Sequence, residues 1–258
     1  MYFIDVQGTL ISDSDKSPIR GSIAFIDKLN ADKTPYMVIT NNTKKSSQDF
    51  YGFLNSIGFN FSFDKYLDPL MLLESRVQKS TVAAYGAEEF LVTLQKMGYV
   101  LDYENPKTVL VAIKEDFNAD EYAQMIDFIL DGAVLVGMHE TSIYAKNSKR
   151  YPGVGAVLKL LEFATSCSYT VIGKPSTAFY GESLKGLQQQ NSDAEFENII
   201  MISDDVKGDL GGAKEMGMKT IFVTSGKYKT EAEIVPFLEE NLKPDFVYGD
   251  MQEILETL

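Results

Sequence analysis

The chain has 258 residues, of which 45% are apolar, and it carries a formal net charge of −13. Its length suits one compact domain with an insertion, and its apolar content is sufficient for a buried core. Because a chain this acidic repels nucleic acids and anionic membrane surfaces, we expect neither as a partner.

Strands and helices alternate at both ends of the chain. Short apolar runs and helical spacing of apolar residues predict a strand at 2–5, a helix at 22–30, a strand at 36–40 and a helix at 46–57. The alternation returns with predicted strands at 198–203, 219–226 and 245–250 and helices at 210–217 and 251–258. This order predicts an α/β fold with a doubly wound parallel sheet.

The middle of the chain has an alternation of its own. Its predicted strands lie at 82–86, 99–101, 109–113 and 134–138, and its helices lie near 87–97, 119–130 and 154–164. We therefore expect a second α/β unit at 78–171, inserted into a core made of 1–77 and 172–258.

The chain contains one cysteine, Cys167, and one histidine, His139. This excludes an intramolecular disulfide and a zinc cluster built from His and Cys, and it disfavours a Ser-His-Asp site. The first residues predict a strand, not a signal peptide, and no run reaches the length of a membrane span. We expect a cytoplasmic protein.

Four polar clusters follow predicted strands or lie in nearby loops. They are DVQGT (5–9), TNNT (40–43), GKP (173–175) and SDDVKGD (203–209). Each one alone is typical of an ordinary turn. Because ligands of open parallel sheets bind beyond the carboxyl ends of the strands, the four together predict one shared site.

The predicted site has the composition of a phosphoryl-transfer centre. Its carboxylates, Asp5, Asp204 and Asp209, suit Mg²⁺, which takes one or two carboxylates together with water and phosphate oxygens. Lys174 supplies a positive charge for a phosphoryl oxygen, and main-chain N–H groups around Gly8 complete an anion cradle. Thr40 and Asn41 add neutral hydrogen-bond donors.

In this order, the four clusters resemble the motifs of the haloacid dehalogenase (HAD) superfamily of phosphatases. TNNT, VIGKP and SDDVKGDLGGAKEMGMKTIFVTSG are similar to its NagD-like, 4-nitrophenylphosphatase-type branch, known as subclass IIA. Two segments of the middle unit, GAEEFLVTLQKMGY and YPGVGAVLKLLEFAT, resemble that branch's cap. The resemblance covers essentially the whole chain and implies a HAD core with an inserted α/β C2-type cap.

The resemblance also implies a role for each matching residue. Asp5 would be the nucleophile that forms an aspartyl phosphate on a small phosphorylated metabolite, and also a Mg²⁺ ligand. Asp204 would be the second carboxylate that binds Mg²⁺, and Asp209 would support the water ligands of the metal. Lys174 would neutralise the charge of the phosphoryl group. The phosphoryl group would be bound by Gly8, Thr40, Asn41 and Asn42. His139 and Tyr144 would contact the substrate if their cap loop faces the core, and caps of this branch often pair in a homodimer.

Position 7 departs from the family pattern, which usually has an acid/base Asp two residues after the nucleophile. Gln7 keeps the main-chain carbonyl that would bind the metal, but its amide is neither a useful acid nor a useful base. General acid–base catalysis contributes roughly 10²–10⁴-fold, so we expect weakened turnover.

Several alternatives stay open for a chain with Gln7. It could be a slow or narrow phosphatase, a regulatory homologue that binds a phosphorylated ligand without turnover, or an engineered Asp-to-Gln trap. Phosphonate or halide cleavage is a further alternative, but the TNN motif and the cap resemble the phosphatase branch.

Overall fold

The computed structural model describes residues 1–146 and 149–257, and these form two parallel sheets and one hairpin. Within them, the first sheet has six parallel strands in the order β13-β12-β11-β1-β2-β3. The strands are β1 (Tyr2–Ile4), β2 (Tyr36–Ile39), β3 (Tyr66–Leu67), β11 (Ile200–Ser203), β12 (Lys219–Val223) and β13 (Phe246–Tyr248). Strand β1 lies between β2 and β11, so residues that follow these three strands meet at one sheet edge.

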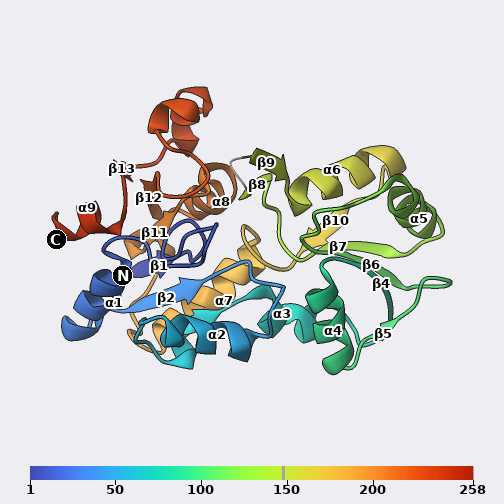
Figure 1. Cartoon of the computed structure of the whole chain (residues 1–258), viewed down its shortest axis with the longest axis horizontal. Helices are drawn as coiled ribbons and strands as arrows, with labels where there is room; N and C mark the ends of the chain where they lie inside the picture. The colour runs from blue at the N-terminus through green and yellow to red at the C-terminus, as the bar shows by residue number, and fades with distance from the viewer. Residues whose placement is uncertain (147–148, 258) are drawn as a thin grey trace.

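Helices cover both faces of the first sheet (Figure 1). One face carries α1 (Ser22–Ala31), α2 (Ser47–Ser56) and α9 (Met251–Leu255), and the other carries α3 (Pro69–Arg76), α7 (Thr177–Gln188) and α8 (Gly211–Glu215). Successive strand residues point to opposite faces. Phe3 accordingly stacks on Tyr180 of α7, whereas its neighbour Ile4 packs in a separate cluster with Phe25 of α1.

A second parallel sheet forms in the middle of the chain, with the order β10-β7-β6-β4-β5. It contains β4 (Thr81–Tyr85), β5 (Val100–Leu101), β6 (Thr108–Val111), β7 (Val134–Gly137) and β10 (Tyr169–Val171). Helices α5 (Ala119–Leu130) and α6 (Val154–Thr165) pack on one face, and α4 (Glu88–Lys96) packs on the other. An antiparallel hairpin, β8 (Ile143–Lys146) and β9 (Lys149–Pro152), precedes α6.

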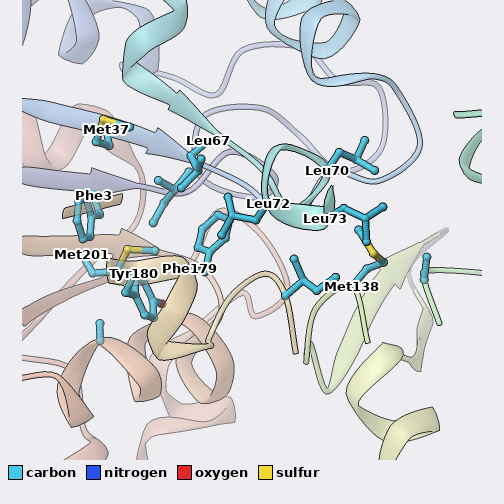
Figure 2. Close-up of a cluster of buried hydrophobic side chains, with 14 of the residues drawn as sticks. Phe3, Met37, Leu67, Leu70, Leu72, Leu73, Met138, Phe179, Tyr180 and Met201 are labelled. Carbon is cyan, nitrogen blue, oxygen red and sulfur yellow. The ribbon is translucent and has the colours of Figure 1, made fainter. Parts of the chain in front are cut away.

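Short turns of helix complete the chain: η1 (Phe63–Lys65), η2 (Phe196–Asn198), η3 (Val206–Leu210), η4 (Glu231–Glu233), η5 (Val235–Phe237) and η6 (Glu240–Leu242). The two sheets share a continuous hydrophobic cluster. Figure 2 shows this cluster running from Phe3 and Met201 past Leu70 and Leu73 to Met138, which follows β7. Helix α3 therefore lies where the two sheets meet.

The predicted doubly wound α/β fold is confirmed. The sequence did not predict α3, α7, β3, β10 or the hairpin. Helix α3 begins at Pro69 after Asp68, whose side chain accepts the Met71 N–H, and α7 begins after Ser176, whose hydroxyl accepts the Phe179 N–H. Glycines at 181 and 186 lower the helix propensity of α7, although Tyr180, Leu184 and Leu187 keep helical spacing.

Other expected elements differ at their ends. The helix expected at 210–217 is a wider turn of helix, η3, followed by α8, and α9 is shorter than expected. Residue 258, the last of the predicted closing helix, lies outside the described residues. The strands of the second sheet come from residues 81 to 171, and the division of the chain at 78 and 171 stays a prediction. No helix in the part of the chain that the structure describes is long and apolar enough to cross a bilayer.

We predict that Leu73→Ala lowers the free energy of unfolding by about 2–5 kcal/mol, because it leaves a cavity where the two sheets meet. The Leu73 side chain is fully buried, whereas Leu130 at the end of α5 is 61% exposed. Leu130→Ala is the matched control and should change the same quantity by less than about 0.5 kcal/mol. If both variants lowered the free energy of unfolding equally in urea, Leu73 would not be part of a core shared by the two sheets.

Candidate active site

Three of the predicted polar clusters begin at the ends of neighbouring strands. Asp5 follows β1, Thr40 follows β2 and Asp204 follows β11. Main-chain hydrogen bonds fix these exits, with the Asp5 N–H bonding to the Ile202 carbonyl at 2.9 Å. The sheet therefore brings together segments that are far apart in sequence.

Lys174 lies at the centre of the site and is 1% exposed. Its Nζ donates to Asp5 Oδ1 at 2.5 Å, to Asp209 Oδ2 at 2.7 Å and to the Ile39 carbonyl at 3.3 Å. Burial alone would lower the pKa of this ammonium, but Asp209 and Asp5 raise it above its ordinary value. Lys174 is therefore a permanent cation that holds Asp5 in place.

Asn41 and Asn42, which follow β2, use their side chains to fix neighbouring loops by hydrogen bonds. Asn41 Oδ1 accepts the main-chain N–H of Lys174 at 2.9 Å, which fixes the loop that carries the lysine. Asn42 Nδ2 donates to the Lys45 carbonyl at 2.8 Å and to buried Asp68 at 3.3 Å. The phosphoryl-binding roles implied for these two residues stay predictions.

Gln7 is held by Thr40. The Thr40 hydroxyl accepts the Asn42 N–H at 3.2 Å and donates to Gln7 Oε1 at 2.7 Å. Because Oε1 is the accepting atom, the amide nitrogen Nε2 is left as a donor on the other side of the amide group. Both Gln7 and the Asp5 carboxylate line the same cavity.

Asp204 is packed so closely that two neighbours must be glycine. A Cβ added to Gly8 would lie 2.3 Å from Asp204 Oδ2, and one added to Gly226 would lie 1.9 Å from it. Gly8 also has a φ of +79°, which residues with a side chain rarely adopt. The glycine turn after Asp5 therefore leaves room for a second carboxylate.

Sequence reasoning missed Lys227 and Asp205, which complete the charge pattern. Lys227 Nζ bonds to Asp205 Oδ2 at 2.6 Å, and its main-chain N–H bonds to Asp204 Oδ2 at 2.8 Å. The signal for Lys227 was the SGK turn at the end of the strand predicted at 219–226. Asp205 stood beside Asp204 in the fourth motif.

Except for Gly8 and Thr40, the predicted site residues line one cavity of about 1410 Å³. His139, which follows β7, and Tyr144, in β8, both line it from the second sheet's side. The Tyr144 ring stacks on Tyr151 with the ring centres 5.4 Å apart. The cavity is lined further by cationic side chains, namely Lys16, Lys44, Lys45, Lys149, Arg150 and Lys229.

The donor set fits a hard divalent cation bound by few protein ligands. No group of three or more His, Cys, Asp or Glu side chains in the described residues has the arrangement of a metal site. Burial raises the pKa of Asp204 well above its usual range; Lys227 opposes this, and Asp5 adds to it. Asp5 and Asp204 are buried carboxylates, and Mg²⁺ is typically bound by one or two carboxylates together with water and phosphate oxygens.

The other predicted metal residue, Asp209, is engaged elsewhere in this structure. Its Oδ2 accepts from Lys174 and from the Ser203 hydroxyl, at 2.7 Å and 2.8 Å. The main-chain carbonyl of Asp209 accepts from the Tyr180 hydroxyl at 2.7 Å. Its implied role beside the metal stays a prediction.

Comparison with known proteins agrees with this geometry. Residues 2–100 match the family described as haloacid dehalogenase-like hydrolase, and residues 171–254 match the one described as HAD-hydrolase-like. Human haloacid dehalogenase-like hydrolase domain-containing protein 2 is 29% identical over 89% of this chain and 86% of its own length. Bovine phospholysine phosphohistidine inorganic pyrophosphate phosphatase is 26% identical over 99% of this chain and 92% of its own.

The fold has a solved counterpart in the p-nitrophenyl phosphatase from Archaeoglobus fulgidus. That structure is 21% identical, with a TM-score of 0.81 over 100% of this chain and 98% of the other. The predicted resemblance to the 4-nitrophenylphosphatase-type branch is therefore confirmed at the level of the fold. The two family matches, over residues 2–100 and 171–254, show that the chain belongs to the haloacid dehalogenase-like hydrolases.

Proposed function

We propose that the chain is a Mg²⁺-dependent phosphatase that forms an aspartyl phosphate on Asp5. The observation that carries this proposal is the buried contact of Lys174 with Asp5 and Asp209 at the floor of the cavity. Lys174 holds one Asp5 oxygen, and its charge would attract a phosphoryl group to the same point. Attack by an Asp5 oxygen on phosphorus would form the new bond while the bond to the leaving group breaks.

Asp5, Asp204 and the main-chain carbonyl of Gln7 would hold the metal. Bound Mg²⁺ would neutralise phosphoryl oxygens as charge develops on them. The surplus negative charge around buried Asp204 supports this assignment. Lys227, which is bonded to Asp205, would limit the repulsion among the acids when an anionic substrate enters.

Gln7 would decide which substrates react. With Oε1 held by Thr40, its Nε2 can donate a hydrogen bond to a substrate oxygen but cannot transfer a proton. Leaving groups that depart as stable anions need no proton, so they would be favoured over alkoxides. The name of one structural relative, a p-nitrophenyl phosphatase, fits this preference, because nitrophenolate is a stable anion.

The substrate would be a small phosphorylated metabolite. A cavity of about 1410 Å³ is larger than a phosphate ion needs and holds a metabolite-sized molecule. Cationic and acidic side chains line this cavity in nearly equal number, whereas the chain has a net charge of −13, so an anionic ligand meets less repulsion in the cavity than elsewhere on the protein.

We predict that Gln7→Asp raises the steady-state rate of hydrolysis by roughly 10²–10⁴-fold on an alkyl phosphate and by less on p-nitrophenyl phosphate. Departure of the alkoxide depends on a proton donor and departure of nitrophenolate does not, whereas hydrolysis of the aspartyl phosphate needs a base with either substrate. The measurement is phosphate release from both substrates, with Asp5→Asn as the blank.

The time course of the unaltered chain separates the alternatives. A burst of nitrophenolate without steady turnover would indicate a trapped aspartyl phosphate. If neither the chain nor Gln7→Asp exceeds the Asp5→Asn blank, the phosphatase proposal fails, and ligand binding without turnover becomes the better account.

We predict that EDTA abolishes hydrolysis and that added Mg²⁺ restores it. Asp204→Asn removes one of two metal carboxylates and should raise the Mg²⁺ concentration for half-maximal rate at least about tenfold. Asp131→Asn is the matched control, because Asp131 is an exposed carboxylate at the end of α5 and does not line the cavity. Full activity in EDTA would contradict the metal assignment.

A further inference from the structure

The only histidine of the chain, His139, lies in the wall of the cavity. It follows β7, a strand in the interior of the second sheet, between β6 and β10. The residue is 5% exposed. The histidine thus reaches the candidate site from the opposite side to Asp5.

Main-chain hydrogen bonds on both sides of His139 fix its position relative to Lys174. The Gly173 N–H donates to the Met138 carbonyl at 2.9 Å, and the Glu140 N–H donates to the Lys174 carbonyl at 3.1 Å. Asn41 holds the same lysine loop from the first sheet. The imidazole and the Lys174 ammonium are therefore carried by two adjacent loops, which main-chain hydrogen bonds join at two points.

The hydrogen bonding of the ring identifies its tautomer. Nδ1 accepts the Thr141 main-chain N–H at 3.4 Å. A neutral imidazole has one accepting and one donating nitrogen, so the proton resides on Nε2. Within the described residues, no hydrogen bond involves Nε2, and this atom is not among the buried polar atoms that lack a partner.

Burial and two nearby lysines keep the imidazole ring of His139 uncharged. Burial is the largest cause that lowers the pKa of His139, to about 3; Lys227 and Lys174 lower it further, and Asp205 opposes them. Lys227 and Asp205 follow strands of the first sheet, whereas Lys174 belongs to the loop after β10. His139 is accordingly an N–H donor at neutral pH, with no positive charge of its own.

We propose that His139 binds the phosphorylated substrate directly, by donating a hydrogen bond from Nε2–H to one of its oxygens as a neutral donor. The proposal rests on the proposed function, since it assigns a contact within the same site. An anionic substrate drawn between Lys174 and Lys227 offers acceptor oxygens on the side where the ring lies. A neutral donor suits such a position, because a third cation there would repel both lysines.

The single histidine makes the tautomer directly measurable. Protein labelled with ¹⁵N in the histidine ring should show one pair of ring signals, with the proton on Nε2 and no titration between pH 6.5 and about pH 5. A ring that titrates near 6.5, or that carries its proton on Nδ1, overturns the proposal.

Substrate contact is tested in an Asp5→Asn protein, which binds without turnover, using p-nitrophenyl phosphate and Mg²⁺. The Nε2 signal should shift on binding. His139→Leu should raise Kd about three- to tenfold, the loss of one hydrogen bond, whereas His139→Gln, which can place an amide N–H near the same point, should bind within about twofold of the parent. Hydrolysis by each variant with Asp5 intact should show the same order.

The outcomes separate this proposal from the proposed function. If p-nitrophenyl phosphate binds but neither the Nε2 signal nor the His139→Leu affinity changes, the histidine contact is wrong and the phosphatase proposal stands. If equal losses occur in His139→Leu and His139→Gln, the ring serves packing only. If nothing binds and no variant turns over, both proposals fail.

We also predict that His139 makes the fold sensitive to mild acid. Its pKa is 6.5 when unfolded and about 3 when folded, so the unfolded chain binds the extra proton first. The contribution of the neutral ring to the free energy of unfolding is therefore fully present above pH 6.5 and is lost as the pH drops towards 3. In urea unfolding, the midpoint of the unaltered chain should fall more between pH 6.5 and about pH 5 than that of His139→Gln. Parallel pH dependence in the two proteins would show that the ring is not buried neutral.

Discussion

The buried ammonium of Lys174 is the interaction on which the rest of the site depends. It joins Asp5, at the end of the central strand, to Asp209, in the turn after β11. An isolated buried charge would be very unfavourable, so the lysine and its two carboxylates stabilise one another only as a set. The loop that carries Lys174 must therefore be held in place. Asn41, the main-chain carbonyl of Met138 and the main-chain N–H of Glu140 hold it through hydrogen bonds.

The same constraint links the two sheets. The Lys174 loop follows β10, the edge strand of the second sheet, but its side chain ends at the edge of the first. Apolar packing of Leu70 and Leu73 against Met138 holds the sheets together beneath this loop (Figure 2). The polar site and the shared hydrophobic cluster consequently depend on the same backbone placement, and a shift of one sheet would pull the lysine away from its carboxylates.

The sequence predicted the parts of the site that depend on local patterns of apolar and polar residues. Asp5, Thr40 and Asp204 could be placed at one edge because each follows an apolar run, and parallel strands bring such exits together. The pairing of Thr40 with Gln7 and of Lys227 with Asp205 could not be foreseen, because both join residues distant in sequence through side-chain geometry. Helix α7 was missed for a different reason. Its two glycines lower its helix propensity, while the Ser176 cap and packing on Phe3 still stabilise it.

Gln7 and His139 have the same electrostatic property, because each is a neutral hydrogen-bond donor in the wall of the cavity. Thr40 directs the Gln7 amide so that a nitrogen is left to donate, and Thr141 does the same for the imidazole of His139. Both groups are neutral donors beside the cations Lys174 and Lys227. Such a set stabilises an anion without exchanging protons with it, so bond cleavage would depend on the leaving group's own stability. The missing carboxylate at position 7 would then narrow the range of substrates while leaving the binding of a phosphoryl group intact.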